Sequence, residues 1–316
     1  MRTLVINTAF LGDLIFTLPL LESLGRAGHV VDLVARPRFG ALAGGTPGLA
    51  RTWSFDKRGA DAGPLGLWRL GRRLRAERYD LVLGAHPSAR SGLLAAATGA
   101  PRRLGWGPIG YTTRVRRGPR FVLDALALGE AAGVPVATRR PCVRARGPHP
   151  AIPPGAVALI PGARWATKRW PVEHWRALAD RLRDAGHVVV AVGGAAERPL
   201  AANLGPHLDA FGLDLPATAA LLADCVAAVG GDSGLAHLAR AVGTPVVMLF
   251  GPTPAARHPP DVGRVDRMVA GLSCRPCSDH GPRVCPLGHH ACLRRLAPLD
   301  AWQGLHAAID GGPCGP

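Results

Sequence analysis

The sequence predicts an α/β protein made of two doubly wound domains, each with a parallel sheet covered by helices on both faces. The chain has 316 residues, which suits two cores of about 150 residues better than one. Short apolar runs alternate with helical patterns in both halves. A proline-rich stretch without such patterns, residues 134–155, separates them. We therefore place a first domain at residues 1–150, with this linker at its end, and a second at residues 151–316.

The first half shows the alternation directly after its N-terminus. An apolar strand is predicted at residues 3–7, a helix from about 13 to 26, and a second strand at 29–35. Amphipathic or apolar runs then continue the alternation at residues 68–78, 79–85, 88–99 and 121–133. Strands this rich in β-branched and apolar residues are typical of parallel sheets that are buried on both faces.

The second half repeats the pattern. A strand at 156–163 leads into a loop, and residues 171–186 form a helix with Pro171 in its first turn and Gly186 beyond its end. Further buried strands are predicted at residues 187–194, 225–231 and 244–252. In such sheets ligands bind beyond the carboxyl ends of the strands. We therefore expect a site in a cleft between the domains, formed by the loops at residues 8–14, 161–171, 192–199 and 229–245.

The net charge of +16 belongs almost wholly to the first half. Residues 1–150 hold 23 Lys and Arg against 9 Asp and Glu, a charge of +14, whereas the remainder carries +2. This asymmetry fits a solvated arginine-rich surface, or a half that meets an anionic partner such as nucleic acid, a membrane surface or an acidic substrate. All the basic residues are arginines except Lys57 and Lys168, and an ammonium kept in such a background indicates a place where a guanidinium does not fit.

Nothing in the sequence predicts a membrane span. No apolar run approaches the roughly 18–20 residues needed to cross a bilayer. Asp13 interrupts the first apolar stretch where a signal peptide would have its apolar core. We expect a cytoplasmic protein.

The loop at residues 229–245 has the strongest chemical signal. Its strand ends in two glycines, and Asp232, Ser233 and Gly234 then open a helix that carries His237. Glycines let the backbone approach a ligand, and the N–H groups at a helix start favour a phosphate or diphosphate. The alternative is structural, with Asp232 and Ser233 as helix caps and His237 as a packing histidine.

The loop at residues 161–171 is cationic, with Arg164, Lys168 and Arg169 beside two tryptophans. These cations suit a diphosphate leaving group, whose negative charge grows in the transition state; the alternative is an amphipathic loop that packs its tryptophans. Neither this loop nor the loop at residues 229–245 contains G-x-G-x-x-G, and the sequence has no G-x-x-x-x-G-K-[ST] pattern. This argues against a dinucleotide dehydrogenase and a P-loop NTPase.

The first strand-end loop, "TAFLGDL", holds a single charge, Asp13, between a strand and a helix. Such a carboxylate either caps the helix or acts as a base.

Together these segments resemble one family, the heptosyltransferases of glycosyltransferase family 9. The resemblance covers nearly the whole chain, through "TAFLGDLIFTLPLLESL", "PGARWATKRWPVEHWRALA", "VGGDSGLAHLARAVGTPVVMLFGPT" and "CRPCSDHGPRVCPLGHHACL". The last segment is most similar to the heptosyltransferase II branch. The resemblance implies a GT-B fold, in which two Rossmann-like domains face a cleft. It also implies inverting transfer of L-glycero-D-manno-heptose from an ADP-sugar to the inner core of lipopolysaccharide.

The resemblance also implies roles for individual residues. Asp13 matches the general base of the acceptor domain. Lys168 matches the lysine that neutralises the leaving ADP, and Glu197 matches the residue that binds the ribose hydroxyls. Four residues match the segment that holds the heptose and the diphosphate: Asp232, Ser233, Gly234 and His237. Basic residues cluster at residues 72–78, 101–106, 114–120 and 139–146. We assign the acceptor side to Gly12, Asp13 and four arginines of the second and third clusters: Arg102, Arg103, Arg114 and Arg117.

One stretch departs from the family pattern. Some members have a Thr-Thr pair before the lysine, where this chain has Gly162, Ala163 and Arg164. Backbone N–H groups or Arg164 would have to hold the phosphate here.

The resemblance implies ADP-heptose and an anionic lipid A/Kdo-core acceptor as partners, with peripheral contact to the cytoplasmic side of the inner membrane and no required cofactor. Two alternatives stay open: a family 9 transferase with another nucleotide-sugar or acceptor, and a protein that binds nucleic acid or an anionic surface. We expect no nucleic-acid partner, because aromatic residues make up only 5% of the chain and do not interleave with basic ones.

Four of the seven cysteines lie in one run, with the pattern C-x2-C-x7-C-x6-C: Cys274, Cys277, Cys285 and Cys292. The run begins like a zinc site but lacks a second C-x2-C pair. It allows either a structural metal site or four thiols in an ordered loop.

Overall fold

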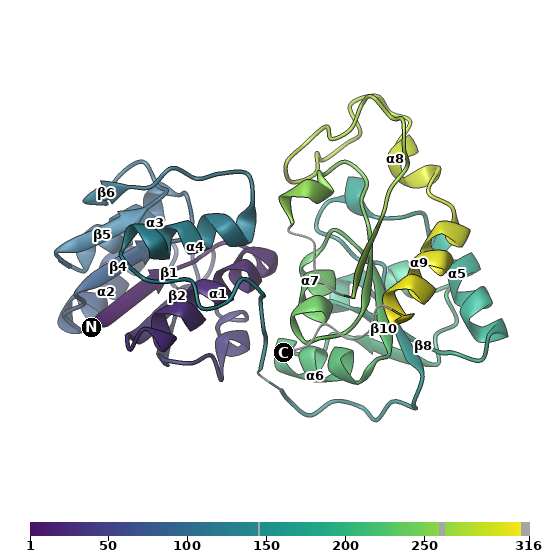
Figure 1. Ribbon diagram of the computed structural model, residues 1–316, viewed down its shortest axis with the longest axis horizontal. Coiled ribbons are helices and arrows are strands. Elements are labelled where there is room, and N and C mark those ends of the chain that lie inside the picture. The colour runs from purple at the N-terminus through teal and green to yellow at the C-terminus, as the bar shows by residue number, and fades with distance from the viewer. Residues whose placement is uncertain (145, 259–262, 311–316) are drawn as a thin grey trace. The chain divides into compact units, whose positions relative to one another are not determined.

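The computed structural model describes residues 1–144, 146–258 and 263–310. The chain divides into two compact units, Met1–Ala145 and Arg146–Pro316, which are described separately (Figure 1). No helix within the described residues has the length and apolar character needed to cross a membrane.

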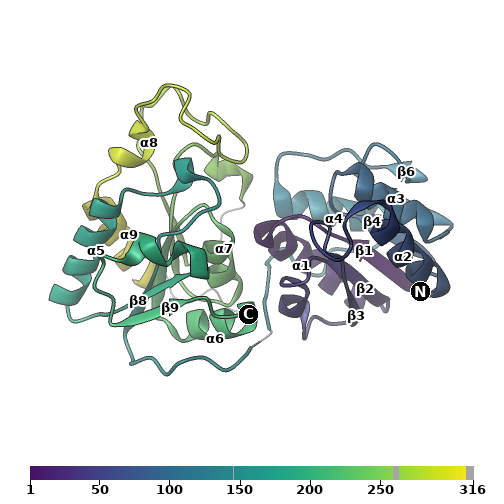
Figure 2. The ribbon, with the colours of Figure 1, turned by 180° about the vertical axis from the view of Figure 1, so that it is seen from behind.

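The first unit contains a six-stranded parallel sheet in the order β3-β2-β1-β4-β5-β6. Its strands are β1 (Arg2–Ile6), β2 (Val30–Ala35), β3 (Leu49–Ser54), β4 (Leu81–Gly84), β5 (Arg102–Gly105) and β6 (Thr113–Arg114). Its helices are α1 (Leu11–Arg26), α2 (Gly63–Ala76), α3 (Ala89–Ala97) and α4 (Phe121–Ala131). Helix α1 packs beside α4, and α2 packs beside α3. The two pairs cover opposite faces of the sheet, as in other doubly wound folds (Figure 2).

The second unit has the same arrangement, with the order β12-β11-β10-β7-β8-β9. Its strands are β7 (Ala156–Ile160), β8 (Val188–Gly193), β9 (Leu208–Phe211), β10 (Ala227–Gly231), β11 (Val246–Leu249) and β12 (Arg264–Arg267). Its helices are α5 (Val172–Asp184), α6 (Leu215–Asp224), α7 (Gly234–Ala241), α8 (Ala291–Arg294) and α9 (Pro298–Asp310). Helices α5 and α9 pack on one side of the sheet, and α6 packs beside α7.

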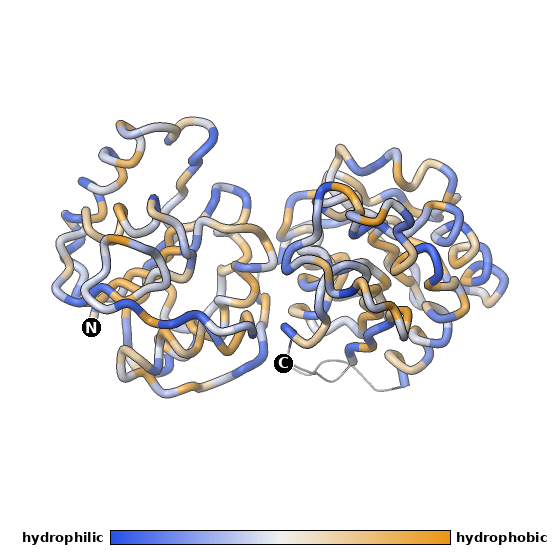
Figure 3. The backbone as a smooth tube through the Cα atoms, turned by 90° about the horizontal axis from the view of Figure 1, so that it is seen from above, coloured by the Kyte–Doolittle hydropathy of each residue, from blue (hydrophilic) through white to orange (hydrophobic). Residues whose placement is uncertain are grey.

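The predicted α/β class is confirmed, and the central strands lie where the apolar runs predict them. β1, β4, β7 and β10 are buried along their full lengths apart from the partly exposed start of β1. Apolar and hydrophilic residues alternate along both units, as amphipathic helices around buried strands require (Figure 3). The amphipathic run at 68–78 belongs to α2, which begins five residues before it with a proline in its first turn.

Edge strands are what the sequence patterns miss. β6, at the edge of the sheet, and β5 beside it lie in segments that we interpret from sequence only as basic clusters. Both carry arginine, and β6 is exposed. Charged residues on short edge strands prevent pairing with other chains, and they also remove the apolar pattern by which a strand is predicted.

In each sheet the strand order reverses between two central strands: β1 and β4 in the first unit, β7 and β10 in the second. Ligands of doubly wound sheets bind at this switch point, beyond the carboxyl ends of the strands. The loops that follow these four strands are therefore the places to examine for function.

A buried carboxylate, Asp32 on β2, stabilises the first unit's core. Tyr79 donates its hydroxyl to Asp32 at 2.5 Å, and the Trp53 indole N–H lies 3.2 Å from the same oxygen. The Asp32 side chain is fully buried, so each lost donor leaves lone pairs without a partner in a low-dielectric interior.

Tyr79→Phe is expected to lower the free energy of unfolding by about 1–3 kcal/mol, because it removes one donor from this carboxylate. Urea unfolding followed by tryptophan fluorescence measures the change. Tyr111→Phe is the matched control, since the Tyr111 hydroxyl is buried without a hydrogen-bond partner among the described residues. The control is expected to leave stability unchanged or raised; equal losses in both variants would contradict the role given to Asp32.

Candidate active site

In the second unit, Lys168 and Asp232 form an ion pair at the switch point. Lys168 ends a short 3-10 turn, Ala166–Lys168, in the loop after β7, and Asp232 follows β10 directly. The Lys168 Nζ lies 2.6 Å from Asp232 Oδ2, and the exposed fractions of the two side chains are only 13% and 11%. A nearly buried ammonium at the carboxyl edge of a sheet is well placed for an anionic ligand.

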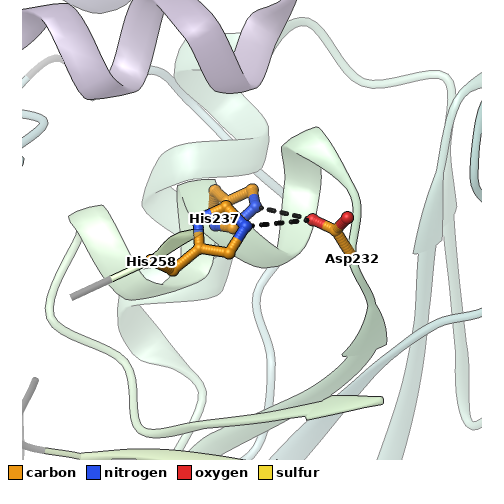
Figure 4. Close-up of side chains that lie close together, drawn as sticks. All are labelled: Asp232, His237 and His258. Carbon is orange, nitrogen blue, oxygen red and sulfur yellow. Dashed lines mark hydrogen bonds and ion pairs between the residues drawn. The ribbon is translucent and has the colours of Figure 1, made fainter. Parts of the chain in front are cut away.

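Asp232 has three further partners, from two other segments. Thr253, in the loop after β11, donates its hydroxyl to Oδ2 at 2.8 Å. His237 Nε2 lies 3.1 Å from Oδ1, and His258 Nε2 lies 3.6 Å from the same atom. Figure 4 shows both imidazole rings pointing a nitrogen at this oxygen, and their centroids are 4.6 Å apart.

These contacts fix the charge states of the cluster. Burial alone would raise the pKa of Asp232, but the hydrogen bond with His237 and the charge of Lys168 hold it well below its usual value. Burial lowers the pKa of His237, and it lowers that of His258 to about 2. Near neutral pH the cluster therefore consists of one carboxylate, one ammonium and two neutral imidazoles.

The start of α7 lies beside this pair. Ser233 is the N-cap, and its hydroxyl accepts from the Ala236 N–H at 3.4 Å, which is the structural role left open by the sequence. Gly234 is the first helical residue and has no side chain to cover the other N–H groups of the first turn. Those groups point along the helix axis toward any anion at this edge.

Glu197 lies at the same edge, after β8. Its Oε2 accepts from the Gly194 N–H at 2.9 Å, and its carboxylate packs against Gly162, where a Cβ would collide with it. The glycine in "PGA" thus permits the approach of the acid. A carboxylate has four lone-pair sites, so Glu197 can also accept from hydroxyl groups of a ligand.

The Lys168 loop is held by distant segments of the chain. A Cβ on Gly231 would lie 2.8 Å from the Lys168 carbonyl oxygen, and one on Gly281 would lie 2.7 Å from Lys168 Cδ. Gly281 also has a φ of +89°, which favours glycine. Thr167 donates to the Pro282 carbonyl at 2.5 Å, and the Thr167 carbonyl lies 2.7 Å from His290 Nε2. Within this loop, the Arg164 guanidinium lies over the Trp165 ring, 5.1 Å from its centroid.

Three cysteines of the run, Cys274, Cys277 and Cys285, lie in the supporting segment at residues 271–290, which contains no helix or strand. The fourth, Cys292, lies in α8. Cys277 is exposed and Cys292 is buried, and all four thiols are free. Among the described residues, one group of metal-ligand side chains has its ligand atoms within 4.8 Å of one another: Asp232, His237 and His258. The four cysteines do not form such a group. At the His–Asp group a cation would have to share Asp232 with the Lys168 ammonium, which does not suit a divalent ion.

In the first unit, Asp13 lies in the first turn of α1, directly after the β1 loop. Its Oδ2 accepts from the Phe10 N–H at 3.1 Å, so the carboxylate helps to close the helix start. Asn7 donates to the Asp13 carbonyl at 3.0 Å and fixes the turn. Gly12 and Asp13 are both half-buried.

Lys57, one of a group of neighbouring cations that was not predicted as a site, interacts electrostatically with Asp13. Lys57, in the loop after β3, donates to the Thr8 carbonyl at 2.8 Å. Burial lowers the pKa of Lys57, and so do three guanidinium groups near it, whereas Asp13 acts in the opposite direction; these groups are Arg36, Arg90 and Arg58. A small pocket opens here, lined by Lys57, Arg58, Ser88 and Arg90.

His86 closes the back of this region, at the carboxyl end of β4. Its Nδ1 lies 3.0 Å from the Thr8 hydroxyl and 3.1 Å from that of Ser91. Burial, and then the charges of Lys57 and Arg117, lower the pKa of His86 to about 4. His86 is therefore neutral near pH 7 and orients hydroxyl groups rather than adding charge.

The structure does not bring the four predicted arginines together. Arg102 and Arg103 are paired with Leu81 and Val82 at the amino end of the sheet, the edge opposite to Asp13. Arg114 ends β6 on the sheet's exposed border, and Arg117 stacks on Trp106 at 5.1 Å while facing Asp124. We therefore withdraw Arg102 and Arg103 from the acceptor side, because strand direction separates them from Asp13.

Comparison with known proteins identifies the family. Residues 140–287 match the family model described as glycosyltransferase family 9 (heptosyltransferase). Lipopolysaccharide heptosyltransferase 1 of Pseudomonas aeruginosa is 31% identical, over 88% of this chain and 86% of that protein. Lipopolysaccharide heptosyltransferase 2 of Escherichia coli is 28% identical, over 98% of this chain and 99% of that one. The solved ADP-heptose lipopolysaccharide heptosyltransferase II of E. coli matches with a TM-score of 0.73 and 22% identity, over 98% of each chain.

The resemblance inferred from the sequence is thereby confirmed, although relatives of both the first and the second kind of enzyme match. The expected fold is confirmed as well, since both sheets have the strand order of a Rossmann-like domain. The chain belongs to glycosyltransferase family 9, the heptosyltransferases, and is a glycosyltransferase.

Proposed function

We propose that this enzyme transfers L-glycero-D-manno-heptose from ADP-heptose to the inner core of lipopolysaccharide, with inversion at the anomeric carbon. The observation that carries the proposal is the convergence of Lys168, the start of α7 and Glu197 at one edge of the second sheet. The names of the relatives, which are lipopolysaccharide heptosyltransferases, support both the donor and the acceptor.

The donor side suits a nucleotide diphosphate sugar. The Lys168 ammonium and the N–H groups of the α7 first turn supply positive charge for the diphosphate. The resemblance assigns the ribose hydroxyls to Glu197, and the heptose to Asp232 and His237. This charge distribution balances the departing ADP without calling for a metal ion, and activity is expected to persist in a chelator.

The acceptor side suits an anionic saccharide. The pocket of Lys57, Arg58, Ser88 and Arg90 offers three cations and a hydroxyl for a carboxylate or phosphate group. Asp13 interacts electrostatically with Lys57 of this pocket, and its position after β1 matches that of the family's general base. The lysine that is conspicuous in the sequence, Lys57, thus gains a role as an anion ligand.

The proposed chemistry is one inverting displacement. Asp13 accepts the proton of the acceptor hydroxyl as that oxygen bonds to the anomeric carbon of the heptose. The bond between this carbon and the diphosphate oxygen breaks, and ADP leaves with its charge opposed by Lys168. The product is the glycoside of opposite anomeric configuration.

The experiment measures ADP release from ADP-heptose with inner-core acceptors of defined length, with and without EDTA. Acceptor-dependent release would support the proposal, and the preferred acceptor decides between the two kinds of heptosyltransferase, of which the cysteine segment favours the second. Tight ADP binding without release to any heptose acceptor would contradict the heptose donor and leave another nucleotide-sugar.

A further inference from the structure

Helix α2 presents an unusual surface to solvent. The outer face of α2 consists of Leu65, Trp68, Arg69 and Arg72, which are spaced so that they form one stripe. The opposite side of the helix holds Leu70 and Leu74, which are buried in the first unit's core. The helix is therefore anchored in the first unit by one face, and the other face is exposed.

The two apolar side chains of this face are strongly exposed. Leu65 is 72% exposed and Trp68 is 56% exposed, although they lie one turn apart on the same stripe. The Arg72 guanidinium lies 4.9 Å from the Trp68 ring centroid, so cation and aromatic ring form one unit. Adjacent exposed apolar residues of this size indicate a surface that another partner covers.

The charge of α2 is not neutralised. Residues 63–76 contain four arginines and no acidic residue. None of the four forms an ion pair with a described residue, whereas Arg26 and Arg51 elsewhere in this unit each pair with a glutamate. An uncompensated set of guanidinium groups favours a partner with negative charge.

The exposed apolar residues of α2 lie at the carboxyl edge of the first sheet. Helix α2 follows the loop after β3, so Leu65 and Trp68 lie toward the carboxyl edge of the sheet, where Asp13 and Lys57 lie. Helix α3 packs against α2, and it exposes Leu93 (45%) one turn from its own start at the same edge. The apolar side chains therefore gather at the end of the unit that carries the cationic pocket.

We propose that the outer face of α2 binds the surface of an anionic lipid bilayer. Leu65 and Trp68 insert at the level of the headgroups, and Arg69 and Arg72 contact lipid phosphates. A nucleic acid or an acidic protein would use the arginines, but neither requires exposed leucine and tryptophan on the same stripe. The inference concerns bilayers without acceptor, so it stands apart from heptose transfer.

The test measures binding of the full chain to vesicles of phosphatidylcholine alone and of phosphatidylcholine with roughly one third phosphatidylglycerol, by cosedimentation. The wild type is expected to bind the anionic vesicles about tenfold or more tightly, and to lose this preference as salt is raised. Leu65→Ser with Trp68→Ser, and Arg69→Gln with Arg72→Gln, are each expected to weaken binding by about tenfold or more.

The matched control is Arg176→Gln with Arg294→Gln, which removes the same charge from exposed positions of the second unit. It is expected to bind like the wild type, and heat unfolding and ADP binding verify that each variant is folded. Equal binding to both kinds of vesicle, or unchanged binding by the α2 variants, would overturn the proposal. Loss of duplex DNA binding in the arginine variant, with vesicle binding intact, would overturn it in favour of nucleic acid.

Discussion

Asp13→Asn is expected to lower the turnover number by a hundredfold or more while leaving the fold and donor binding unchanged. An amide cannot take up the proton of the acceptor hydroxyl, and general base catalysis typically contributes 10²–10⁴-fold. The asparagine oxygen can still accept from the Phe10 N–H, so the start of α1 keeps its hydrogen bond. The loss is therefore expected in the turnover number rather than in stability.

The measurement is acceptor-dependent ADP release at saturating concentrations of both substrates, with ADP affinity and urea unfolding recorded alongside. Glu130→Gln is the matched control, since it removes an exposed carboxylate from the same unit. A turnover number within tenfold of the wild type in Asp13→Asn would assign the base to another group and leave Asp13 as a helix cap.

Lys168→Met is expected to have two separable effects, on catalysis and on stability. Loss of one charged group that stabilises a developing anion typically lowers the rate by 10²–10³-fold. The same substitution leaves Asp232 nearly buried without its cation, and breaking a buried pair from one side costs on the order of 3 kcal/mol. Inactivity alone would not distinguish a catalytic lysine from a structural one.

The variants Lys168→Met with Asp232→Asn, and Lys168→Arg, make the distinction. The double variant removes both charges, so it is expected to recover most of the lost stability and none of the activity. Lys168→Arg keeps the charge, but Gly281 packs against the lysine stem, so a longer guanidinium is expected to restore activity only in part. A folded and fully active double variant would remove Lys168 from the mechanism.

The ion pair also predicts a pH dependence. Asp232 has a folded pKa below the ordinary value of 3.8, so its contribution to stability is present above that pH and is lost as the pH falls through the folded pKa. Between pH 5 and 8 the pair is therefore expected to stay intact, and a fall in activity within this window must come from another group.

The sequence predicts the centre of each sheet and the residues that directly follow central strands. Asp13, Lys168 and Asp232 belong to this class, because an apolar strand followed by a glycine-containing loop can be recognised from the sequence alone. Thr253 and His258 come from the segment after β11, 21 and 26 residues beyond Asp232, and the parallel pairing of β10 with β11 brings this segment to Asp232. Lys57 likewise follows an edge strand, β3, which the sequence does not predict because most of its residues are polar and exposed.

Arg102 and Arg103 show the opposite error. Their clustering in the sequence suggests a shared role with Asp13, but they begin β5 instead of following it. Whether a charged residue lies before or after a strand decides which edge of the sheet it occupies, and a charge count cannot reveal this.

The packing of Gly281 and Pro282 against the Lys168 loop has a consequence for how the chain tolerates change. A protein shortened after residue 270 would keep every residue that we assign to the donor, from Gly162 to His237. It would nevertheless lose the contacts that hold Lys168 in place. Insertions, deletions or oxidation of the cysteines in this segment are therefore expected to lower the affinity for the nucleotide before they affect other properties.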